Sequence, residues 1–233
     1  MDKLKNYVII LASGLGNRYG RNVPKQFLKI GEKTILEYTV EVFEESQFID
    51  NIIVVITPEY KDIAENILKQ NNYKKIINLL EGGATRKESS CIGINAIKED
   101  EANVLIHDCA RPFVTQTIIE DCVNLLEKYN AINVAIPVTD TIIEVDNGAI
   151  SNMLCRSKLM QVQTPQCFKL SLIKKAHEMA KDDSSFTDDC GMVIKYNLAD
   201  VFIANGSQEN IKITYPSDLL LANEILRQRN KSF

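Results

Sequence analysis

The chain has 233 residues, and its 27 lysines and arginines against 31 aspartates and glutamates give a formal net charge of −4 at pH 7. That balance argues against nucleic acid as a partner, so any bound phosphate must be held by local cations. No segment approaches the roughly 18 apolar residues of a membrane-spanning helix, and no signal peptide precedes the first apolar run. We therefore expect a cytoplasmic protein without membrane contact, whose residues 1–233 form a single domain.

The cysteine and histidine content argues against a histidine-based or zinc site and against disulfides. The two histidines, His107 and His177, are too few for a histidine-based metal site. The cysteines are scattered without a Cys-x-x-Cys pair, which favours free thiols in a reducing compartment over disulfides or zinc. They are Cys91, Cys109, Cys122, Cys155, Cys167 and Cys190.

The first predicted element is a buried strand over residues 7–11, followed at once by the small residues and glycines of segment 12–16. Glycines let backbone N–H groups approach a phosphate closely, because no Cβ intervenes. Arg18 and Lys25 add two cations within a short reach of the same loop. Together these features predict a triphosphate-binding loop.

Three other interpretations of this loop compete with a triphosphate site. A Walker A loop requires lysine after its last glycine, whereas Arg21 follows Gly20. A dinucleotide fingerprint would place its third glycine at Tyr19, and its second strand should end in an acidic residue, whereas residues 52–56 lead into Thr57. A plain turn with surface cations does not explain why Arg18 and Lys25 both follow one strand.

Strands and helices then alternate along the chain. Strands are predicted at residues 51–56, in a short segment ending near 80, and at 103–107, 131–138 and near 201. Helices are predicted after the capping boxes Thr34-x-x-Glu37, Thr85-x-x-Glu88 and Thr117-x-x-Glu120, after Thr57-Pro58, over 170–180 and from Pro216. This order predicts an α/β fold, a Rossmann-like doubly wound and mainly parallel sheet, with the loops after residues 11, 80, 106 and 138 at one edge.

Residues 139–163 interrupt this alternation. Asp146-Asn147-Gly148 lies between two short apolar segments and predicts a β-hairpin. An isolated two-stranded ribbon is marginally stable in water, so we expect this protruding arm to pack on something, such as another subunit.

Two further loops could carry chemistry. The segment 81–89 places backbone amides, Arg86 and Ser89 at a helix N-terminus, which suits a base edge or an anion but is also an ordinary helix cap. Asp108 follows a buried strand, where a carboxylate is a good Mg²⁺ ligand, and Arg111 could instead form a structural pair with it. Later in the chain, Arg156 suits a phosphate monoester.

These motifs together resemble the polyol-phosphate cytidylyltransferases, a group that contains the methylerythritol-phosphate and the ribitol-5-phosphate enzymes. The resemblance runs from about residue 7 to residue 221. Its motifs in this chain are LASGLGNRYG…PKQF, GGATRKES, HDCARP, DT…R…QTPQ, TDD and NIKIT. It implies a nucleotidyltransferase that moves CMP from CTP to a polyol phosphate with Mg²⁺ and releases pyrophosphate, and a homodimer built by the arm.

The resemblance also implies residue roles, transferred position by position. Nucleotide contacts are implied for Ala12, Ser13, Gly14, Gly16, Gly83, Ser89 and Asp108, with Asp108 also the metal ligand. Cations at the reacting phosphates are implied at Arg18, Lys25 and Lys212, and acceptor contacts at Arg111, Thr141, Arg156, Thr164 and Thr187. One departure is Ser90, where the family usually has valine.

The acceptor is less well defined than the nucleotide. Methylerythritol-phosphate enzymes usually have lysine where this chain has Ile143 and glutamate near Ile194, and Cys190 is nearer to the ribitol-phosphate pattern. The sequence around His107 is instead closer to the methylerythritol style. We favour ribitol 5-phosphate, with methylerythritol 4-phosphate as the alternative. An NAD(P)-dependent oxidoreductase and a non-catalytic nucleotide-binding module are the other hypotheses.

Overall fold

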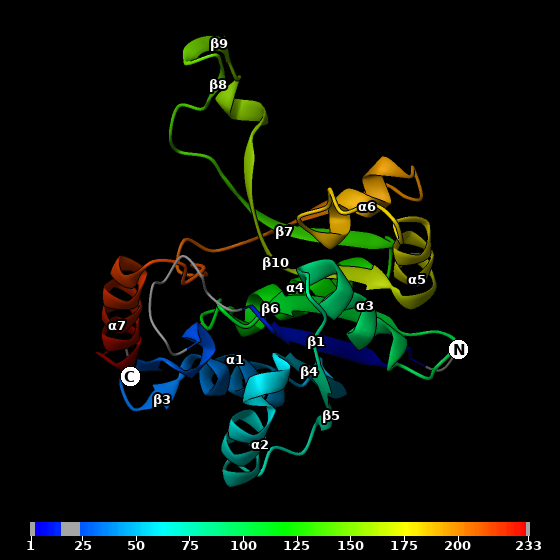
Figure 1. The fold of residues 1–233 in the computed structure, drawn as a ribbon, viewed down its shortest axis with the longest axis vertical. Helices are drawn as coiled ribbons and strands as arrows, with labels where there is room; N and C mark the ends of the chain where they lie inside the picture. The colour runs from blue at the N-terminus through cyan, green and yellow to red at the C-terminus, as the bar shows by residue number, and fades with distance from the viewer. Residues whose placement is uncertain (1–2, 15–23, 232–233) are drawn as a thin grey trace.

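A computed structural model describes residues 3–14 and 24–231 and contains a seven-stranded sheet. Helices cover both faces of this sheet (Figure 1). The strand order is β11-β7-β10-β6-β1-β4-β5. Only β10 runs antiparallel to its neighbours in this sheet. The strands are β1 (Asn6–Ala12), β4 (Asn51–Ile56), β5 (Ile76–Glu81), β6 (Asn103–Asp108), β7 (Ala131–Pro137), β10 (Met160–Lys169) and β11 (Phe202–Asn205). The predicted doubly wound, mainly parallel sheet is confirmed.

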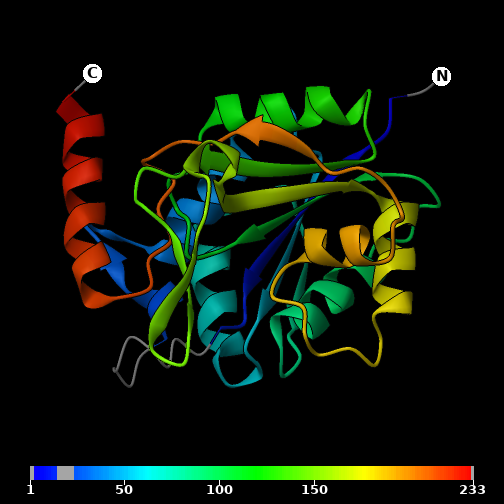
Figure 2. The same ribbon diagram turned by 90° about the horizontal axis from the view of Figure 1, so that it is seen from above.

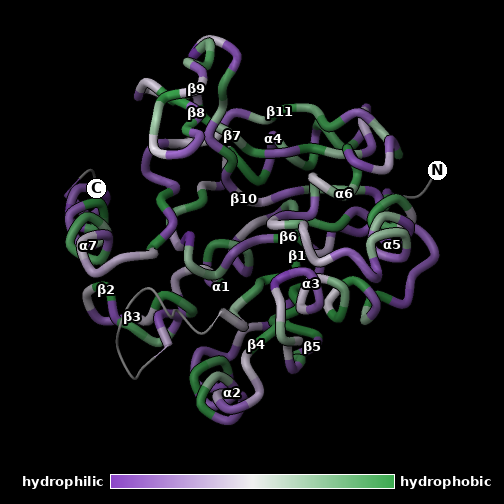
Figure 3. The backbone as a smooth tube through the Cα atoms, turned by 45° about the horizontal axis from the view of Figure 1, so that its top comes forward, coloured by the Kyte–Doolittle hydropathy of each residue, from purple (hydrophilic) through white to green (hydrophobic). Residues whose placement is uncertain are grey.

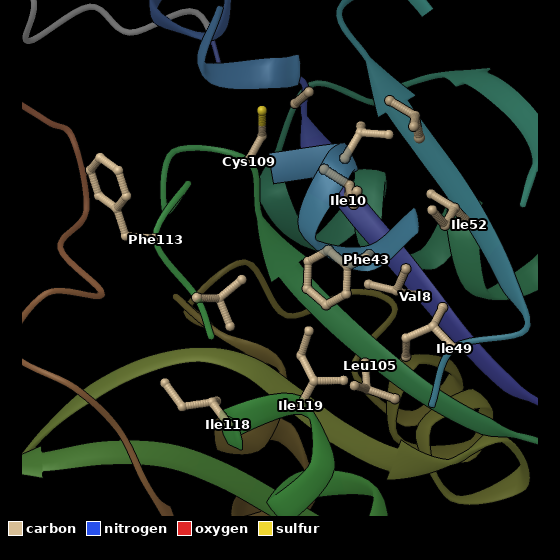
Figure 4. Packing of buried hydrophobic residues seen from close by; sticks show 14 of the residues in the cluster. Val8, Ile10, Phe43, Ile49, Ile52, Leu105, Cys109, Phe113, Ile118 and Ile119 are labelled. Atoms are coloured by element: carbon tan, nitrogen blue, oxygen red, sulfur yellow. The ribbon is translucent and has the colours of Figure 1, made fainter. Parts of the chain in front are cut away.

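Two apolar clusters, one on each face of the sheet, hold the helices in place. Alternate strand residues point to opposite faces, so Val8 and Ile10 of β1 join one cluster while Ile9 joins the other. Figure 4 shows Val8 and Ile10 beside Phe43, which belongs to the first cluster. That cluster includes residues of α1 (Ile35–Glu44), α2 (Lys61–Gln70), α4 (Gln116–Leu126) and α7 (Pro216–Lys231). The second includes α3 (Arg86–Asn95), α5 (Leu170–Met179) and α6 (Asp189–Lys195).

The outer helices are amphipathic, as this packing requires. Figure 3 shows hydrophobic and hydrophilic positions alternating around α2. A small ribbon of β2 (Lys29–Ile30) and β3 (Lys33–Thr34) lies next to α7. The Gly31 N–H between these two strands donates to Asn223 Oδ1 of α7 at 3.1 Å. Within residues 3–14 and 24–231, no helix combines the length and the apolar character needed to cross a membrane.

The predicted helix starts were partly right. Thr34 and Glu37 form a complete capping box, with each side chain accepting from the other residue's N–H. At α3, Thr85 Oγ1 accepts from the N–H of Glu88, but the Glu88 carboxylate accepts from Ala84 instead of completing the box.

Two other helix starts differ from the prediction. The capping box at Thr117 is wrong, because Thr115 is extended and its Oγ1 accepts from Ile118 N–H at 3.3 Å, so α4 already begins at Gln116. Thr57-Pro58 opens a 3₁₀ turn over Pro58–Tyr60 before α2 begins, and Thr57 makes no side-chain cap bond.

The predicted hairpin is present and stands away from the body in Figure 1, whereas in Figure 2, seen from above, it lies in front of the body. It consists of β8 (Ile143–Asp146) and β9 (Ala149–Met153), and every residue of both strands is exposed. Asn147 and Gly148 have φ values of 49° and 81°, the positive values that a two-residue turn of type I′ needs at both central positions.

A buried polar contact ties the three helices of the second face together. Asp189 Oδ1 at the start of α6 accepts from Ser90 Oγ of α3 at 2.7 Å and from His177 Nε2 of α5 at 2.9 Å. Burial disfavours the charged imidazole, but the hydrogen bonds to Asp189 and Cys91 outweigh it and raise the pKa of His177 to about 9. His177 is therefore a cation in the folded protein at neutral pH.

This contact makes stability depend on pH. The folded-state pKa of His177 lies above its ordinary value of 6.5, so the stabilisation is fully present below about pH 6.5 and is lost as pH rises through about 9. We expect the unfolding free energy of the wild type to fall relative to His177→Gln by up to roughly 3 kcal/mol across this window, measured by urea denaturation. A difference between the two proteins that stays constant from pH 6 to pH 10 would contradict the assignment.

Candidate active site

A cavity of about 840 Å³ opens at the carboxyl ends of β1, β4 and β6. The parallel register of these strands, with Leu11 opposite Asp108 and Ala12 opposite Ile56, brings their following loops to one edge. The lining comprises residues 11–14, 25–26, 57–59, 82–86 and 108–110, with Phe186, Thr187, Lys212 and Thr214. The loops after residues 11, 80 and 106 thus converge as predicted, whereas the chain after residue 138 leads into the arm.

The cavity gathers predicted residues of all three kinds: nucleotide contacts, cations at the reacting phosphates and one acceptor contact. The members that line it are Ala12, Ser13, Gly14, Lys25, Gly83, Asp108, Thr187 and Lys212. Gly16 and Arg18 fall outside the described residues. Lys25 is held near β1 by its neighbour Gln26, which is buried and whose Nε2 donates to the Ala12 carbonyl at 2.7 Å.

Ser89 joins the first loop to the Gly83 loop. Its fully buried Oγ accepts from Ser13 Oγ at 2.7 Å and from the Gly83 N–H at 3.2 Å. The same hydroxyl donates to the Thr85 carbonyl at 3.0 Å. Gly82 permits this approach, because a Cβ at that position would lie 2.5 Å from Ser13 Cβ. Ser89 therefore orders the two cavity loops, and Gly83 presents the backbone of the second loop to the cavity.

Asp108 is the charged centre of the cavity. Its Oδ2 accepts from Lys212 Nζ at 2.6 Å and its Oδ1 from Arg86 Nε at 3.1 Å. Burial alone would raise the pKa of this carboxyl, but the neighbouring Arg86 and Lys212 charges hold it well below its usual range. Asp108 is therefore an ionised carboxylate.

Arg111 is not the direct partner of Asp108. Its buried guanidinium donates to the Asn210 carbonyl at 2.7 Å and to the Val162 carbonyl at 3.2 Å. In this structure it joins the Asp108 loop to β10 and to the segment that carries Lys212, and it does not line the cavity. Arg86 takes the place beside Asp108 that the sequence suggested for Arg111.

Thr164 and His107 contact the Asp108 segment but do not line the cavity. Thr164 Oγ1 accepts from the Asp108 N–H at 3.1 Å and lies 3.0 Å from His107 Nδ1. Burial lowers the pKa of His107 to about 4, so this histidine is neutral and supports the loop through its contact with the Arg111 carbonyl at 3.0 Å. Thr164 is 5% exposed, and its hydroxyl holds the Asp108 backbone in place through this hydrogen bond.

The remaining acceptor candidates lie on the arm. Thr141 and Arg156 are exposed, and Arg156 donates to the Thr139 carbonyl at 3.1 Å. Neither residue lines the cavity of its own chain. Of the predicted acceptor residues, Thr187 alone borders the cavity.

Asp189 and His177 were missing from the predicted site, and Arg86 and Ser90 were noted in the sequence without an assigned role. Arg86 lines the cavity and donates from one guanidinium nitrogen to Asp189 Oδ2 at 2.6 Å, and Ser90 and His177 hold the other oxygen of that carboxylate. Arg86 and Asp189 are 103 positions apart, so local spacing gives no sign of their pairing. The available signals were the loop motif GGATRKES, which contains Arg86 and lies next to Ser90, and the motif TDD, which contains Asp189.

The cavity can accept a divalent cation in the manner of magnesium sites. Within the described part of the chain, no group of three or more His, Cys, Asp or Glu side chains could form a metal cage. Magnesium commonly binds through one or two carboxylates together with water and substrate phosphates. Asp108, at the end of β6 and facing the cavity, fits that role.

Comparison with known proteins agrees with this geometry. The model of the IspD family, described as 2-C-methyl-D-erythritol 4-phosphate cytidylyltransferase, matches residues 6–228. A Clostridium novyi protein named 2-C-methyl-D-erythritol 4-phosphate cytidylyltransferase is 41% identical over 225 residues, which cover 95% of this chain and 96% of that protein. A Haemophilus influenzae protein, named bifunctional ribulose 5-phosphate reductase/CDP-ribitol pyrophosphorylase Bcs1, is 39% identical over 99% of this chain. The match spans half the length of that protein.

A solved structure shows the same fold. The crystal structure of 4-diphosphocytidyl-2C-methyl-D-erythritol synthase from Anaerococcus prevotii has a TM-score of 0.85 at 28% identity, and the match covers 96% of each chain. The family match, the extent of the similar sequences and the shared fold lead to one conclusion. The chain belongs to the IspD family of CTP-dependent cytidylyltransferases.

Proposed function

We propose that this protein transfers CMP from CTP to ribitol 5-phosphate and releases pyrophosphate. The observation that carries the proposal is the placement of Lys25, Lys212 and Asp108 around one cavity, at the end of the glycine-containing loop after β1. The family match supports cytidylyl transfer and argues against the oxidoreductase alternative.

The reaction is a displacement at phosphorus. An oxygen of the acceptor phosphate forms a bond to the α-phosphorus of CTP, while the bond from that phosphorus to the bridging oxygen of the β-phosphate breaks. Pyrophosphate leaves with the electron pair of that bond. No covalent enzyme intermediate is needed, so catalysis consists of positioning and of cationic stabilisation of the charge on the phosphates.

Residues of the cavity divide this work between them. The backbone at Ser13 and Gly14 contacts the triphosphate, Gly83 contacts the cytosine, and Lys25 neutralises the phosphates and the leaving pyrophosphate. Lys212 moves from Asp108 to the α-phosphate when the substrates bind. Gly16 and Arg18, in the segment outside the described residues, complete the proposed triphosphate site.

Asp108 would hold a divalent cation, which we propose to be Mg²⁺. The bound ion would supply positive charge that offsets the repulsion between two phosphates. In this structure, Lys212 and Arg86 neutralise the Asp108 carboxylate. The carboxylate can serve both kinds of cation, because its two oxygens offer about four lone-pair positions.

A second copy of the chain completes the acceptor site in this proposal. Thr141 and Arg156 sit on the arm, away from the cavity of their own chain, where Arg156 can bind a phosphate through two parallel N–H groups. The arm also exposes Val145, Ile150 and Met153, each more than half exposed, which is typical of a contact surface. We infer a homodimer in which each arm supplies acceptor contacts to the partner's cavity.

The choice of ribitol 5-phosphate rests on three positions and one relative. Ile143 on the arm and Ile194 on α6 are apolar and exposed where methylerythritol-phosphate enzymes usually carry charged residues, and Cys190 follows the ribitol-phosphate pattern. The Haemophilus influenzae relative is named a CDP-ribitol pyrophosphorylase. The alternative acceptor, 2-C-methyl-D-erythritol 4-phosphate, is favoured by the family description and by the Clostridium novyi relative.

The acceptor can be decided by pyrophosphate release with CTP and Mg²⁺, run in parallel on the two polyol phosphates. We expect turnover with ribitol 5-phosphate and at least 10-fold lower kcat/KM with methylerythritol 4-phosphate, since the site would lack the charged partners for the latter. The reverse order would establish the alternative acceptor. Binding of CTP without turnover of either compound would support a nucleotide-binding module.

The role of Lys25 can be tested with Lys25→Ala. Removing one fixed donor from a reacting phosphate should lower kcat by roughly 100-fold to 1000-fold. The matched control is Lys29→Ala, four positions along the chain on the exposed side of β2, which should retain turnover. Melting temperatures of both variants report on the fold. Near-normal turnover of Lys25→Ala would remove this lysine from the mechanism.

The role of the arm can be tested with Ile150→Glu. A charge in the middle of an apolar contact should convert the dimer into a monomer and raise KM for the acceptor, because the arm residues would leave the partner's site. Light scattering and steady-state kinetics measure the two effects. Ile77→Glu on β5, also an exposed isoleucine, is the control that should remain dimeric. A dimeric Ile150→Glu protein with wild-type kinetics would disprove the inferred contact.

A further inference from the structure

Arg86 lies between two carboxylates that are both anchored to β10. Its Nε donates to Asp108 Oδ1 at 3.1 Å, and a terminal nitrogen donates to Asp189 Oδ2 at 2.6 Å. Thr164 of β10 accepts from the Asp108 backbone at 3.1 Å. Gln166, two residues further along β10, accepts from the Asp189 backbone at 3.0 Å. The backbone N–H groups of both aspartates are thus bonded to side chains of the same strand.

Asp189 makes side-chain hydrogen bonds in addition to its ion pair with Arg86. Its side chain is fully buried, and its second oxygen accepts from Ser90 at 2.7 Å and from His177 at 2.9 Å. A buried carboxylate that accepts three such hydrogen bonds is held in one orientation, so the guanidinium that binds it is fixed as well. Arg86, 25% exposed, reaches the cavity wall from this fixed point.

The contact with Asp189 limits how many nitrogens of Arg86 can bind Asp108. A guanidinium prefers to bind a carboxylate through two parallel N–H groups. Here Asp189 takes one terminal nitrogen, and Asp108 receives only the Nε contact. Without Asp189, the guanidinium could turn and bind Asp108 through two nitrogens, which would compete with any cation that approaches from the cavity.

We propose that Asp189, held by Ser90 and His177, is a positioning residue that keeps Arg86 from a bidentate contact with Asp108 and so leaves this carboxylate accessible to a divalent cation. The proposal rests on the cation-binding role of Asp108 in the proposed function. The proposal also assigns a role to Ser90. The Ser90 hydroxyl is one of the two donors that bind Asp189 Oδ1, and His177 is the other.

The test measures Mn²⁺ binding by calorimetry in the presence of CTP, so that it does not depend on turnover. Asp189→Asn should weaken Mn²⁺ binding roughly 10-fold to 100-fold, the range for residues that orient a metal ligand. The double variant Asp189→Asn/Arg86→Gln should bind Mn²⁺ within about 3-fold of the wild type, because the competing guanidinium is gone. Arg86→Gln alone should bind Mn²⁺ at least as tightly as the wild type.

Asp188→Asn is the matched control. Asp188 is the adjacent carboxylate, caps α6 by accepting from the Gly191 N–H at 2.9 Å, and accepts from Gln166 at 2.7 Å. Its replacement should lower the melting temperature without changing Mn²⁺ affinity. An equal loss of Mn²⁺ binding in Asp188→Asn and Asp189→Asn, or a double variant as weak as Asp189→Asn, would overturn the proposal.

A second variant covers the case in which Asp189→Asn does not fold. Ser90→Val removes one donor from Asp189 and should weaken Mn²⁺ binding roughly 3-fold to 10-fold, an effect that Arg86→Gln should again reverse. Unchanged affinity in Ser90→Val would then refute the proposal. A wild type that binds Mn²⁺ but turns over neither acceptor would count against the proposed function alone, and a wild type that binds no Mn²⁺ would count against this inference.

Discussion

The structure depends on the stabilisation of one buried carboxylate. Asp108 ends a central strand whose six residues are all buried, and a charge in that position would be costly without partners. Lys212 and Arg86, which lie far away in the sequence, supply these partners at 2.6 and 3.1 Å. The cavity wall therefore consists of segments that must come together for Asp108 to be ionised, so the fold and the site are stabilised by the same charges.

The positions of the loops after β1 and β6 could be predicted from sequence, because each depends on local sequence patterns. The apolar run before Ala12 and the strand before Asp108 each place a loop at the carboxyl edge of a parallel sheet, and the lining of the cavity by both loops confirms that placement. Lys212 was predicted through its motif alone. The turn at Asn147-Gly148 was equally readable, because few residues adopt positive φ at two successive positions.

The parts that could not be predicted depend on contacts between distant segments. For Arg111, three residues after Asp108, a structural pair with that carboxylate was the alternative to an acceptor contact. Its guanidinium instead binds two backbone carbonyls, and Arg86 from another loop pairs with Asp108. The cap at Thr117 failed for a local reason, since Thr115 two residues earlier offers the same hydroxyl with an extended backbone. Motif spacing identifies which residue types are present, but tertiary packing decides which of them meet.

The proposed division of the site between the sheet edge and the arm follows from the same physics. In the proposal, backbone groups of the loops that follow β1 and β5 contact the nucleotide within one chain. A flexible polyol phosphate can instead be held by side chains on a separate element. A fully exposed ribbon gains stability only when it packs against another surface, so an acceptor site on such an arm would be complete only after association. In the proposed dimer, binding of the acceptor and assembly of the enzyme would therefore stabilise each other.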